Sequence, residues 1–244
     1  TAPWLRYVSA SGGTTPGMAT VIVCAGALSE TMRIEIRPGV PQVVEIETQP
    51  AAAIAGGEAI SVTLSVLDGA QNPVFDGTAL ELEVAGGVIS PACAITFDGR
   101  ATTRFTPPET AGAVPLTVRV DSTLTITRSL SVRPADAALL ALDANEGWLW
   151  AGQVSVPITA TVRDRFGNLV ADGQRVTLGS TAGSLTPATG LTQGGVVTGT
   201  LAGALPRGQV CISAETGELA ALRCLGVYAP AAWLPFWTAE GANR

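Results

Sequence analysis

Short runs of alternating apolar and polar residues follow one another along most of the chain. In one run Ile60, Val62, Leu64 and Val66 alternate with serine and threonine, and residues 114–120 repeat the pattern. Such period-two alternation predicts strands with one buried and one solvent-facing side. Gly, Pro, Asn and Asp separate the runs, and no long stretch has helical spacing. The pattern predicts an all-β protein made of immunoglobulin-like β-sandwiches, with about seven strands in each.

The runs repeat along the chain with a period of 96 residues. Asp68 returns as Asp164, and Pro38 returns as Pro134 and again as Pro230, always 96 positions later. A constant period of this length indicates a row of similar modules. We expect the period to hold without a slip from one module to the next.

This period divides the chain into four predicted segments. Residues 39–134 and 135–230 are two complete modules, each long enough to bury a core of its own. Residues 1–38 match 97–134, so they are expected to form the last strands of a partial immunoglobulin-like unit. Residues 231–244 are expected to be a donor-like strand or the start of a further module.

Composition narrows the range of chemistry. The net charge is -6 with 14 % charged residues, and there is no basic stripe of the kind that nucleic acid requires. Histidine is absent, which removes Ser-His-Asp and Cys-His nucleophile systems and every His-ligated metal. No run of about 18 apolar residues could cross a membrane. We therefore expect no enzymatic activity, no cofactor, no metal and no nucleic-acid partner.

Two pairs of motifs carry a resemblance to a known family. Residues 66–74 (VLDGAQNPV) and 162–170 (VRDRFGNLV) each combine a strand end, an Asp, a Gly-Asn-type turn and a Val. Residues 87–91 and 183–187 both fit Gly-x-(Leu/Ile)-(Ser/Thr)-Pro, and residues 98–101 read Asp-Gly-Arg-Ala. These segments resemble the bacterial immunoglobulin-like repeats of the invasin and intimin family.

The resemblance covers residues 39–229 and, in part, 1–38. It implies tandem sandwiches in a secreted or surface-attached bacterial protein. Such modules serve as spacers, adhesin stalks and building blocks of surface proteins, so the resemblance is more specific for fold than for function. The lectin-like tip domain with which invasin and intimin bind receptors is not evident in this sequence.

The ends of the chain do not coincide with the predicted module boundaries, and three explanations remain open. The chain is a piece of a longer protein; or its C-terminal strand completes the N-terminal half-sandwich of the next copy, which builds a filament; or the N-terminal piece caps the first module. The residues expected to carry such an assembly are Trp233, Leu234, Phe236, Trp237, Ile22, Ile34 and Ile36.

Four cysteines suggest one or two disulfides. Cys211 and Cys224 flank a predicted hairpin turn, and a bridge between them implies an oxidising compartment. Cys211 is predicted on the outer face but Cys224 aligns with inward positions, so their pairing would need a bulge or a register offset. Cys24 aligns with Val120, which predicts a buried, inert thiol. A bridge from Cys24 to Cys93, within or between chains, stays open.

Two further groups of residues have two interpretations each. Asp68 and Asp164, with Asn72 and Asn168, could bind calcium, but each loop has few carboxylates, so we favour hydrogen bonds to the turn backbone. The tryptophans of residues 148–150 could stack on sugar rings, as in an accessory carbohydrate-binding module of a secreted enzyme. We favour packing at a module junction or against a neighbouring chain.

Together these patterns predict a non-enzymatic extracellular structural protein. Its expected partners are other copies of itself in a head-to-tail polymer and components of the cell surface. The alternatives are a stalk or spacer segment of a longer surface adhesin and an accessory carbohydrate-binding module.

Overall fold

The computed structural model describes residues 13–25, 27–144 and 147–229, and every regular element in them is a β-strand. The all-β prediction is therefore confirmed. No helix in the described ranges is long and apolar enough to cross a membrane. The chain divides into two compact units, Thr1–Arg133 and Pro134–Arg244. The further divisions at residues 38 and 230 remain predictions.

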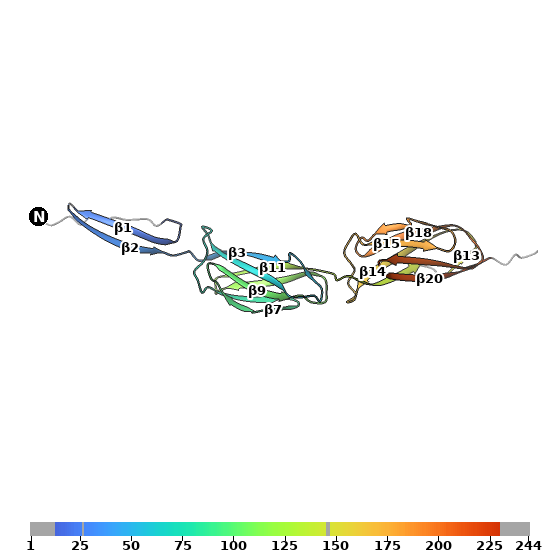
Figure 1. The fold of residues 1–244 in the computed structure, drawn as a ribbon, viewed down its shortest axis with the longest axis horizontal. Coiled ribbons are helices and arrows are strands. Elements are labelled where there is room, and N and C mark those ends of the chain that lie inside the picture. The colour runs from blue at the N-terminus through green and yellow to red at the C-terminus, as the bar shows by residue number, and fades with distance from the viewer. Residues whose placement is uncertain (1–12, 26, 145–146, 230–244) are drawn as a thin grey trace, which may run out of the picture. The chain divides into compact units, whose positions relative to one another are not determined.

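The first unit begins with a hairpin of two antiparallel strands, β1 (Gly17–Ala25) and β2 (Leu28–Ile36), which form a sheet of their own (Figure 1). A sandwich of nine strands follows. These strands are β3 (Pro41–Gln49), β4 (Ala53–Ile54), β5 (Ile60–Asp68), β6 (Ala79–Val84), β7 (Val88–Ser90), β8 (Cys93–Ile95), β9 (Arg100–Thr106), β10 (Gly112–Val120) and β11 (Leu124–Arg133). One sheet has the order β3-β5-β9-β7 and the other β4-β11-β10-β6-β8.

The predicted alternation places the core of the first sandwich between these two sheets. Every second side chain of β5 is buried, from Ile60 to Val66, and the facing strand β10 buries Leu116 and Val118. Phe105 on β9 is completely buried among these aliphatic side chains. The polar residues between them lie on the outer faces, as a half-buried sheet requires.

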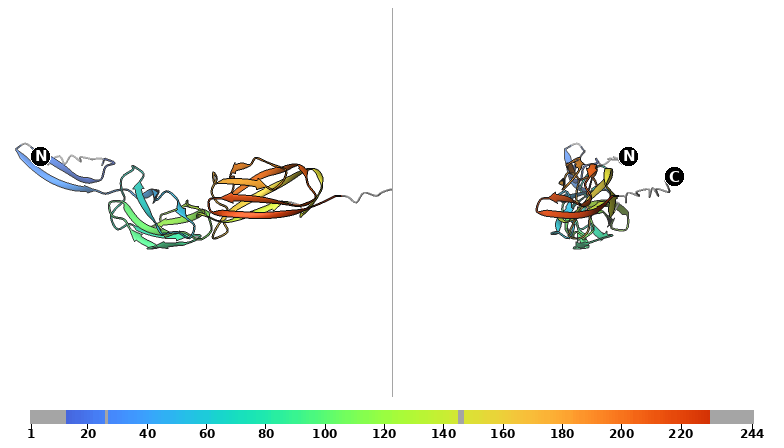
Figure 2. Two further views of the ribbon diagram at one scale, coloured as in Figure 1. Left: turned by 45° about the vertical axis from the view of Figure 1, so that its right-hand side comes forward. Right: turned by 90° about the vertical axis from the view of Figure 1, so that its right-hand side faces the viewer.

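The second unit repeats the arrangement with nine strands. They are β12 (Ala137–Ala144), β13 (Trp148–Trp150), β14 (Gly152–Asp164), β15 (Arg175–Ser180), β16 (Ser184–Thr186), β17 (Thr189–Leu191), β18 (Val196–Leu205), β19 (Gly208–Thr216) and β20 (Leu219–Tyr228). The sheets have the orders β12-β14-β18-β16 and β13-β20-β19-β15-β17. The left view of Figure 2 shows the strands of each sandwich lying side by side. Each sandwich has nine strands rather than about seven, because short pieces such as β13 and β17 pair separately.

The last hairpin is the place where the two sandwiches differ. Residues 121–123 join β10 to β11, whereas Gly217 and Glu218 alone join β19 to β20. As a result β19 begins 96 residues after β10, but Leu219 of β20 follows Leu124 of β11 by only 95. The expectation of a period without a slip is therefore wrong for β20, from Leu219 to Tyr228, although Pro230 again follows Pro134 by 96 residues. Because neighbouring residues of a strand point to opposite faces, this shift reverses which side chains of β20 face the core.

A buried carboxylate fastens the start of the first sandwich to the turn after β5. The carboxylate of Asp68 accepts hydrogen bonds from the backbone amides of Gly39 (2.8 Å), Ala70 (2.8 Å) and Asn72 (2.9 Å). The side-chain amide of Asn72 donates to both carboxylate oxygens. These bonds, first the one from the Asn72 side chain, lower the pKa of Asp68 to about 2.

Asp164 performs the same task in the second sandwich. Its carboxylate accepts hydrogen bonds from the amides of Ala135, Phe166 and Asn168, each at 2.9 Å, and from the Asn168 side chain at 2.8 Å. Burial alone would raise the pKa of Asp164, but these hydrogen bonds outweigh it and leave the pKa below its ordinary value. The turn interpretation of both Asp-Asn pairs is thus supported. Within the described ranges no group of three or more Cys, Asp or Glu could hold a metal ion.

The lowered carboxyl pKa values predict acid sensitivity in a defined pH window. A carboxylate with a folded pKa below its unfolded value stabilises the fold above the unfolded pKa, and this stability is lost as the pH falls through the folded pKa. For Asp68 the window runs from pH 3.8 down to about 2. We expect Asp68→Asn with Asp164→Asn to lower the melting temperature at pH 7 and to flatten its dependence on pH between 5 and 2, as followed by circular dichroism.

The control is Glu218→Gln, which removes an exposed carboxylate in the β19–β20 turn. This variant should keep the pH dependence of the unaltered chain. An equally steep loss of stability in the double variant and in the unaltered chain would contradict the role of the two aspartates.

Candidate functional site

The hairpin β1–β2 presents one largely apolar face. Residues directly opposite each other in the antiparallel pair lie on the same face, and Val21 is opposite Met32 and Ala19 opposite Ile34. The same register adds Val23 and Leu28 to that face, with Glu30 as its charged member. The residues of this face, called the hairpin face below, are Ala19, Val21, Val23, Leu28, Glu30, Met32 and Ile34.

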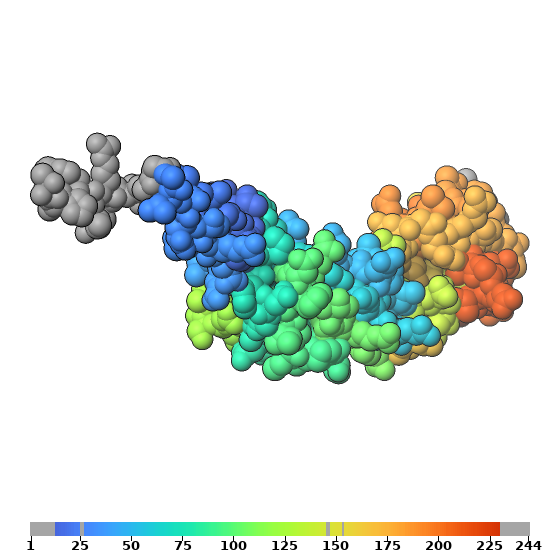
Figure 3. Space-filling view, turned by 60° about the vertical axis from the view of Figure 1, so that its left-hand side comes forward, coloured from blue at the N-terminus to red at the C-terminus, as the bar shows by residue number. Residues whose placement is uncertain are grey.

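Nothing in the described part of the chain covers the hairpin face. Val23, Leu28, Met32 and Ile34 expose between 40 % and 77 % of their surface. Neither β1 nor β2 has a second neighbouring strand among the described residues, so both also have a free backbone edge. Figure 3 shows one side of the hairpin, drawn in blue, as exposed surface.

The residues expected to carry assembly fall into three groups. Ile34 belongs to the hairpin face, and Ile36, opposite Gly17, is half-buried on the same side. Ile22 is opposite Thr31 and therefore lies on the other face, which is mostly polar. An alignment of β1 with β10 at a constant 96 residues did not identify Val21 and Val23 as members of this face. The reason is that the turn between β1 and β2 is one residue shorter than the turn between β10 and β11. Trp233, Leu234, Phe236 and Trp237 lie outside the described residues.

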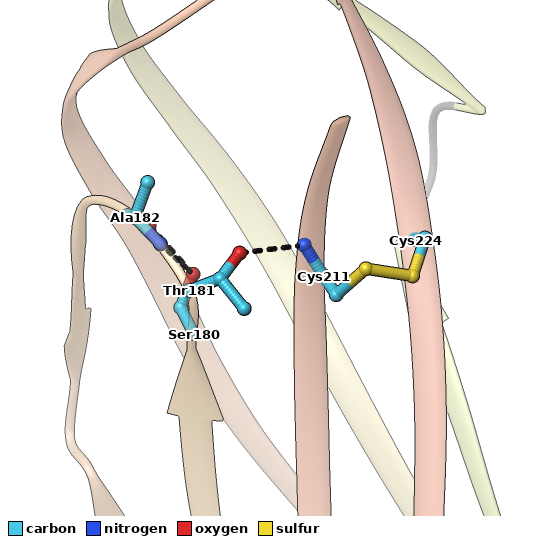
Figure 4. The surroundings of a disulfide bond; sticks show 5 residues. All are labelled: Ser180, Thr181, Ala182, Cys211 and Cys224. Atoms are coloured by element: carbon cyan, nitrogen blue, oxygen red, sulfur yellow. Dashed lines mark hydrogen bonds between the residues drawn. A yellow bond between two sulfur atoms is a disulfide. The ribbon is translucent and has the colours of Figure 1, made fainter. Parts of the chain in front are cut away.

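The bridge between Cys211 and Cys224 is present and connects β19 to β20 (Figure 4). The two residues are direct partners in the ladder, with Cα atoms 3.9 Å apart, so the expected bulge is absent. The backbone amide and carbonyl of Cys211 bond Thr181 on the other side, at 3.0 and 2.9 Å. Cys211 and Cys224 therefore form a non-hydrogen-bonded pair, the type in which opposing side chains come closest.

The expected bulge is unnecessary because of the two-residue turn. Leu225 and Val227 of β20 point into the core, so Cys224 points outward like Cys211. Alignment at a constant 96 residues had placed Cys224 among inward positions. The missing turn residue moves it to the outer face, where it meets Cys211 without any distortion of the ladder.

Cys24 and Cys93 are both exposed free thiols in the structure. The prediction of a buried Cys24 is wrong, because no second sheet faces the hairpin within the described residues. Cys93 lies on β8, one of the two edge strands of the five-stranded sheet in the first sandwich. No bond joins Cys24 to Cys93 within the chain, and a bridge between chains remains a prediction.

Trp148 and Trp150 form a pair on the edge strand β13. Their ring centroids are 5.4 Å apart and the ring planes are nearly perpendicular, at 84°. Both side chains are more than half exposed, whereas Leu149 between them is buried. Tyr228, directly opposite Trp150 on β20, is a third exposed aromatic that the sequence interpretation missed. That Tyr228 lies on the outer face of β20 follows only from the one-residue shift of this strand, which the sequence alignment did not include.

Solved structures share this architecture. The structure of InvD from Yersinia pseudotuberculosis matches with a TM-score of 0.60 and 18 % identity, over 82 % of this chain and 60 % of that one. The crystal structure of invasin, described as a bacterial integrin-binding protein, matches with a TM-score of 0.57 and 18 % identity, over 88 % of this chain and 46 % of that one. No family model matches the chain, and the search of curated proteins found no match.

These matches establish the class of fold. The chain has the bacterial immunoglobulin-like fold of invasin-type proteins, which confirms the resemblance noted from residues 66–74 and 162–170. It spans less than two thirds of either matched chain. At identities this low the likeness concerns fold, so what this chain binds has to be argued from its own surfaces.

Removal of the disulfide should destabilise the second sandwich selectively. We expect Cys211→Ser with Cys224→Ser to lower its free energy of unfolding by about 3 kcal/mol, because the bridge closes a short loop in the unfolded chain. Urea denaturation of the oxidised proteins measures the difference. Cys24→Ser with Cys93→Ser is the matched control and should change stability by less than about 0.5 kcal/mol.

Thiol labelling gives an independent check of the pairing. The native chain should label at Cys24 and Cys93 before reduction and at all 4 cysteines after reduction and unfolding. Labelling of Cys211 or Cys224 without reduction would contradict the assigned bridge.

Proposed function

We propose that this chain is a non-enzymatic structural protein of the bacterial surface, and that it is the protomer of an extracellular filament assembled head to tail by strand donation. The observation that carries the proposal is the uncovered hairpin face. Residues 28–36 of β2 correspond through the 96-residue period to residues 124–132 of β11, and β1 corresponds to β10 with a shift of one residue, so that Val21 and Val23 take the places of Leu116 and Val118. In that sandwich the equivalent strands face a second sheet, whereas the hairpin has none within the described part of the chain.

The energetic motive for assembly is the burial of apolar side chains. Leu116 and Val118 of β10 are completely buried, but Val23, Leu28 and Met32 of the hairpin are exposed. Full burial of one such side chain stabilises a complex by about 1.5–3 kcal/mol before the cost of ordering is subtracted. A contiguous apolar patch beside two free strand edges favours association with an added strand.

The donor in this proposal is the segment with the sequence Trp233-Leu-Pro-Phe-Trp237. By the same period it corresponds to the beginning of β3 and β12, the first strand of each sandwich. The hairpin and a donated strand together have about half the residues of a full module, so the completed unit would be a reduced sandwich. A head-to-tail contact that does not close on itself produces a filament.

An extracellular location fits the chemistry of the second sandwich. The Cys211–Cys224 bridge requires an oxidising compartment to form and persist. The fold is also that of InvD and invasin, and the latter is described as integrin-binding. Binding of a cell-surface component by this chain is part of the proposal.

Two alternatives have support from particular observations. A stalk segment of a longer surface adhesin is favoured by the sandwich architecture itself, and in that case further chain would cover the hairpin face. An accessory carbohydrate-binding module is favoured by the exposed Trp148 and Trp150, because flat aromatic rings can stack on sugars. Only the filament makes the hairpin face an obligatory contact between copies.

Electron microscopy of the purified chain tests the filament. We expect fibres from residues 1–244, and none from a chain truncated after Pro230 or from Met32→Asp with Ile34→Asp, because charges on the hairpin face oppose its burial. The matched control, Ser29→Asp with Thr31→Asp, adds the same charges to the other face of β2 and should still form fibres.

These hairpin substitutions change no residue of either sandwich, and among the described residues β1 and β2 pair only with each other. A loss of fibres in these variants therefore does not arise from unfolding of either sandwich. If all four proteins remain monomeric, the filament is refuted and the chain is better explained as a stalk segment.

A further inference from the structure

Three exposed aromatic side chains meet on one face of the second unit. The parallel pairing of β13 with β20 places Trp150 directly opposite Tyr228, with Trp148 two residues earlier on the same face. Leu149 and Val227, which alternate with them, point into the core. Trp148, Trp150 and Tyr228 expose 52 %, 56 % and 58 % of their surface. These three residues are called the aromatic seat below.

The backbone beneath the aromatic seat is held firmly. The amide of Ala151 donates to the carbonyl of Tyr228 at 2.6 Å, and the amide of Gly226 donates to the carbonyl of Gly147 at 3.3 Å. The ring of Tyr228 lies over Gly226, where a Cβ atom would come within 3.0–3.3 Å of the ring. The disulfide from Cys224 also ties β20 to β19. The backbone positions from which the three rings project are therefore fixed, which lowers part of the entropic cost of binding to them.

The first sandwich has no aromatic seat. The positions that correspond to Trp148 and Trp150 are Ala52 and Ile54, and the position that corresponds to Tyr228 is Arg133.

The segments that follow the two sandwiches differ in the same way. Residues 135–141, with the sequence ADAALLA, contain no aromatic residue, whereas residues 231–237, with the sequence AAWLPFW, contain three. Aromatic residues thus appear together on the sandwich and on the segment behind it, and they are absent together in the other copy. Large rings are buried efficiently against other rings, so a contact between the two sets of aromatic residues would remove both from water.

We propose that the aromatic seat binds Trp233 and Trp237 of its own chain. The segment 231–237 begins three residues after Tyr228, so its effective concentration at the aromatic seat far exceeds that of a separate molecule. The aromatic seat has no charged member, and the two indoles of the segment match it in size and polarity. This contact holds the segment against β13 and β20.

The aromatic seat and strand donation use different sides of the segment. In an extended segment Trp233 and Trp237 share one side, and Leu234 and Phe236 share the other. Contact of the tryptophans with the aromatic seat leaves Leu234 and Phe236 available to the hairpin face of another copy. The contact of Trp233 and Trp237 with the aromatic seat therefore does not require that the chain forms a filament.

Hydrogen exchange measured by mass spectrometry tests the contact. The full chain is compared with Trp148→Ala plus Trp150→Ala, at a concentration where light scattering shows only monomers. We expect peptides from residues 230–244 to exchange severalfold faster in this variant. The control is Leu222→Ala, which removes another exposed apolar side chain from β20 outside the aromatic seat and should leave these peptides unchanged.

A second variant distinguishes loss of the contact from a distortion of β13 caused by the first variant. Trp233→Ser plus Trp237→Ser changes no residue of either sandwich. With Trp4→Phe added, the emission of this variant comes from Trp148 and Trp150 alone, and we expect it to lie at longer wavelength than that of the chain with Trp4→Phe only, because the aromatic seat becomes exposed. Unchanged exchange in the first variant together with unchanged fluorescence in the second would overturn the proposal. Protection of residues 230–244 that disappears on dilution would also overturn it, because the partner would then be another copy.

Discussion

A β-strand with alternating apolar and polar residues is stable only when a second sheet covers its apolar face. The rest of this structure depends on where such a covering sheet is present. In both sandwiches it is present internally, for example where β5 faces β10 and every second side chain is buried. In the hairpin β1–β2 it is not provided by any described residue. The same physical requirement therefore explains the stability of the sandwiches and the proposed assembly through the hairpin face.

The length of a turn decides which side chains of the following strand point into the core and which point outward. Removal of one residue from the last turn of the second sandwich moves Cys224 to the outer face and Leu225 to the core. In the hairpin the register likewise separates Ile22 from Ile34. Both effects follow from the two-residue repeat of a strand, in which a shift by one position exchanges the faces.

The two sandwiches share their frame but differ on the surfaces they present. Asp68 and Asp164 make nearly the same set of hydrogen bonds, so the connection from the first strand to the turn after β5 or β14 is common to both. The aromatic seat and the disulfide belong to the second sandwich alone.

The sequence by itself determined the all-β fold, the spacing of the strands and the turn role of Asp68 and Asp164, because these follow from local alternation and local hydrogen bonding. It also identified the partnership of Cys211 and Cys224. Only the tertiary structure decided which face Cys224 occupies, that Cys24 is exposed, and that Tyr228 joins Trp148 and Trp150. These features depend on register across strands and on the presence or absence of a facing sheet, and neither is encoded in any short stretch of the chain.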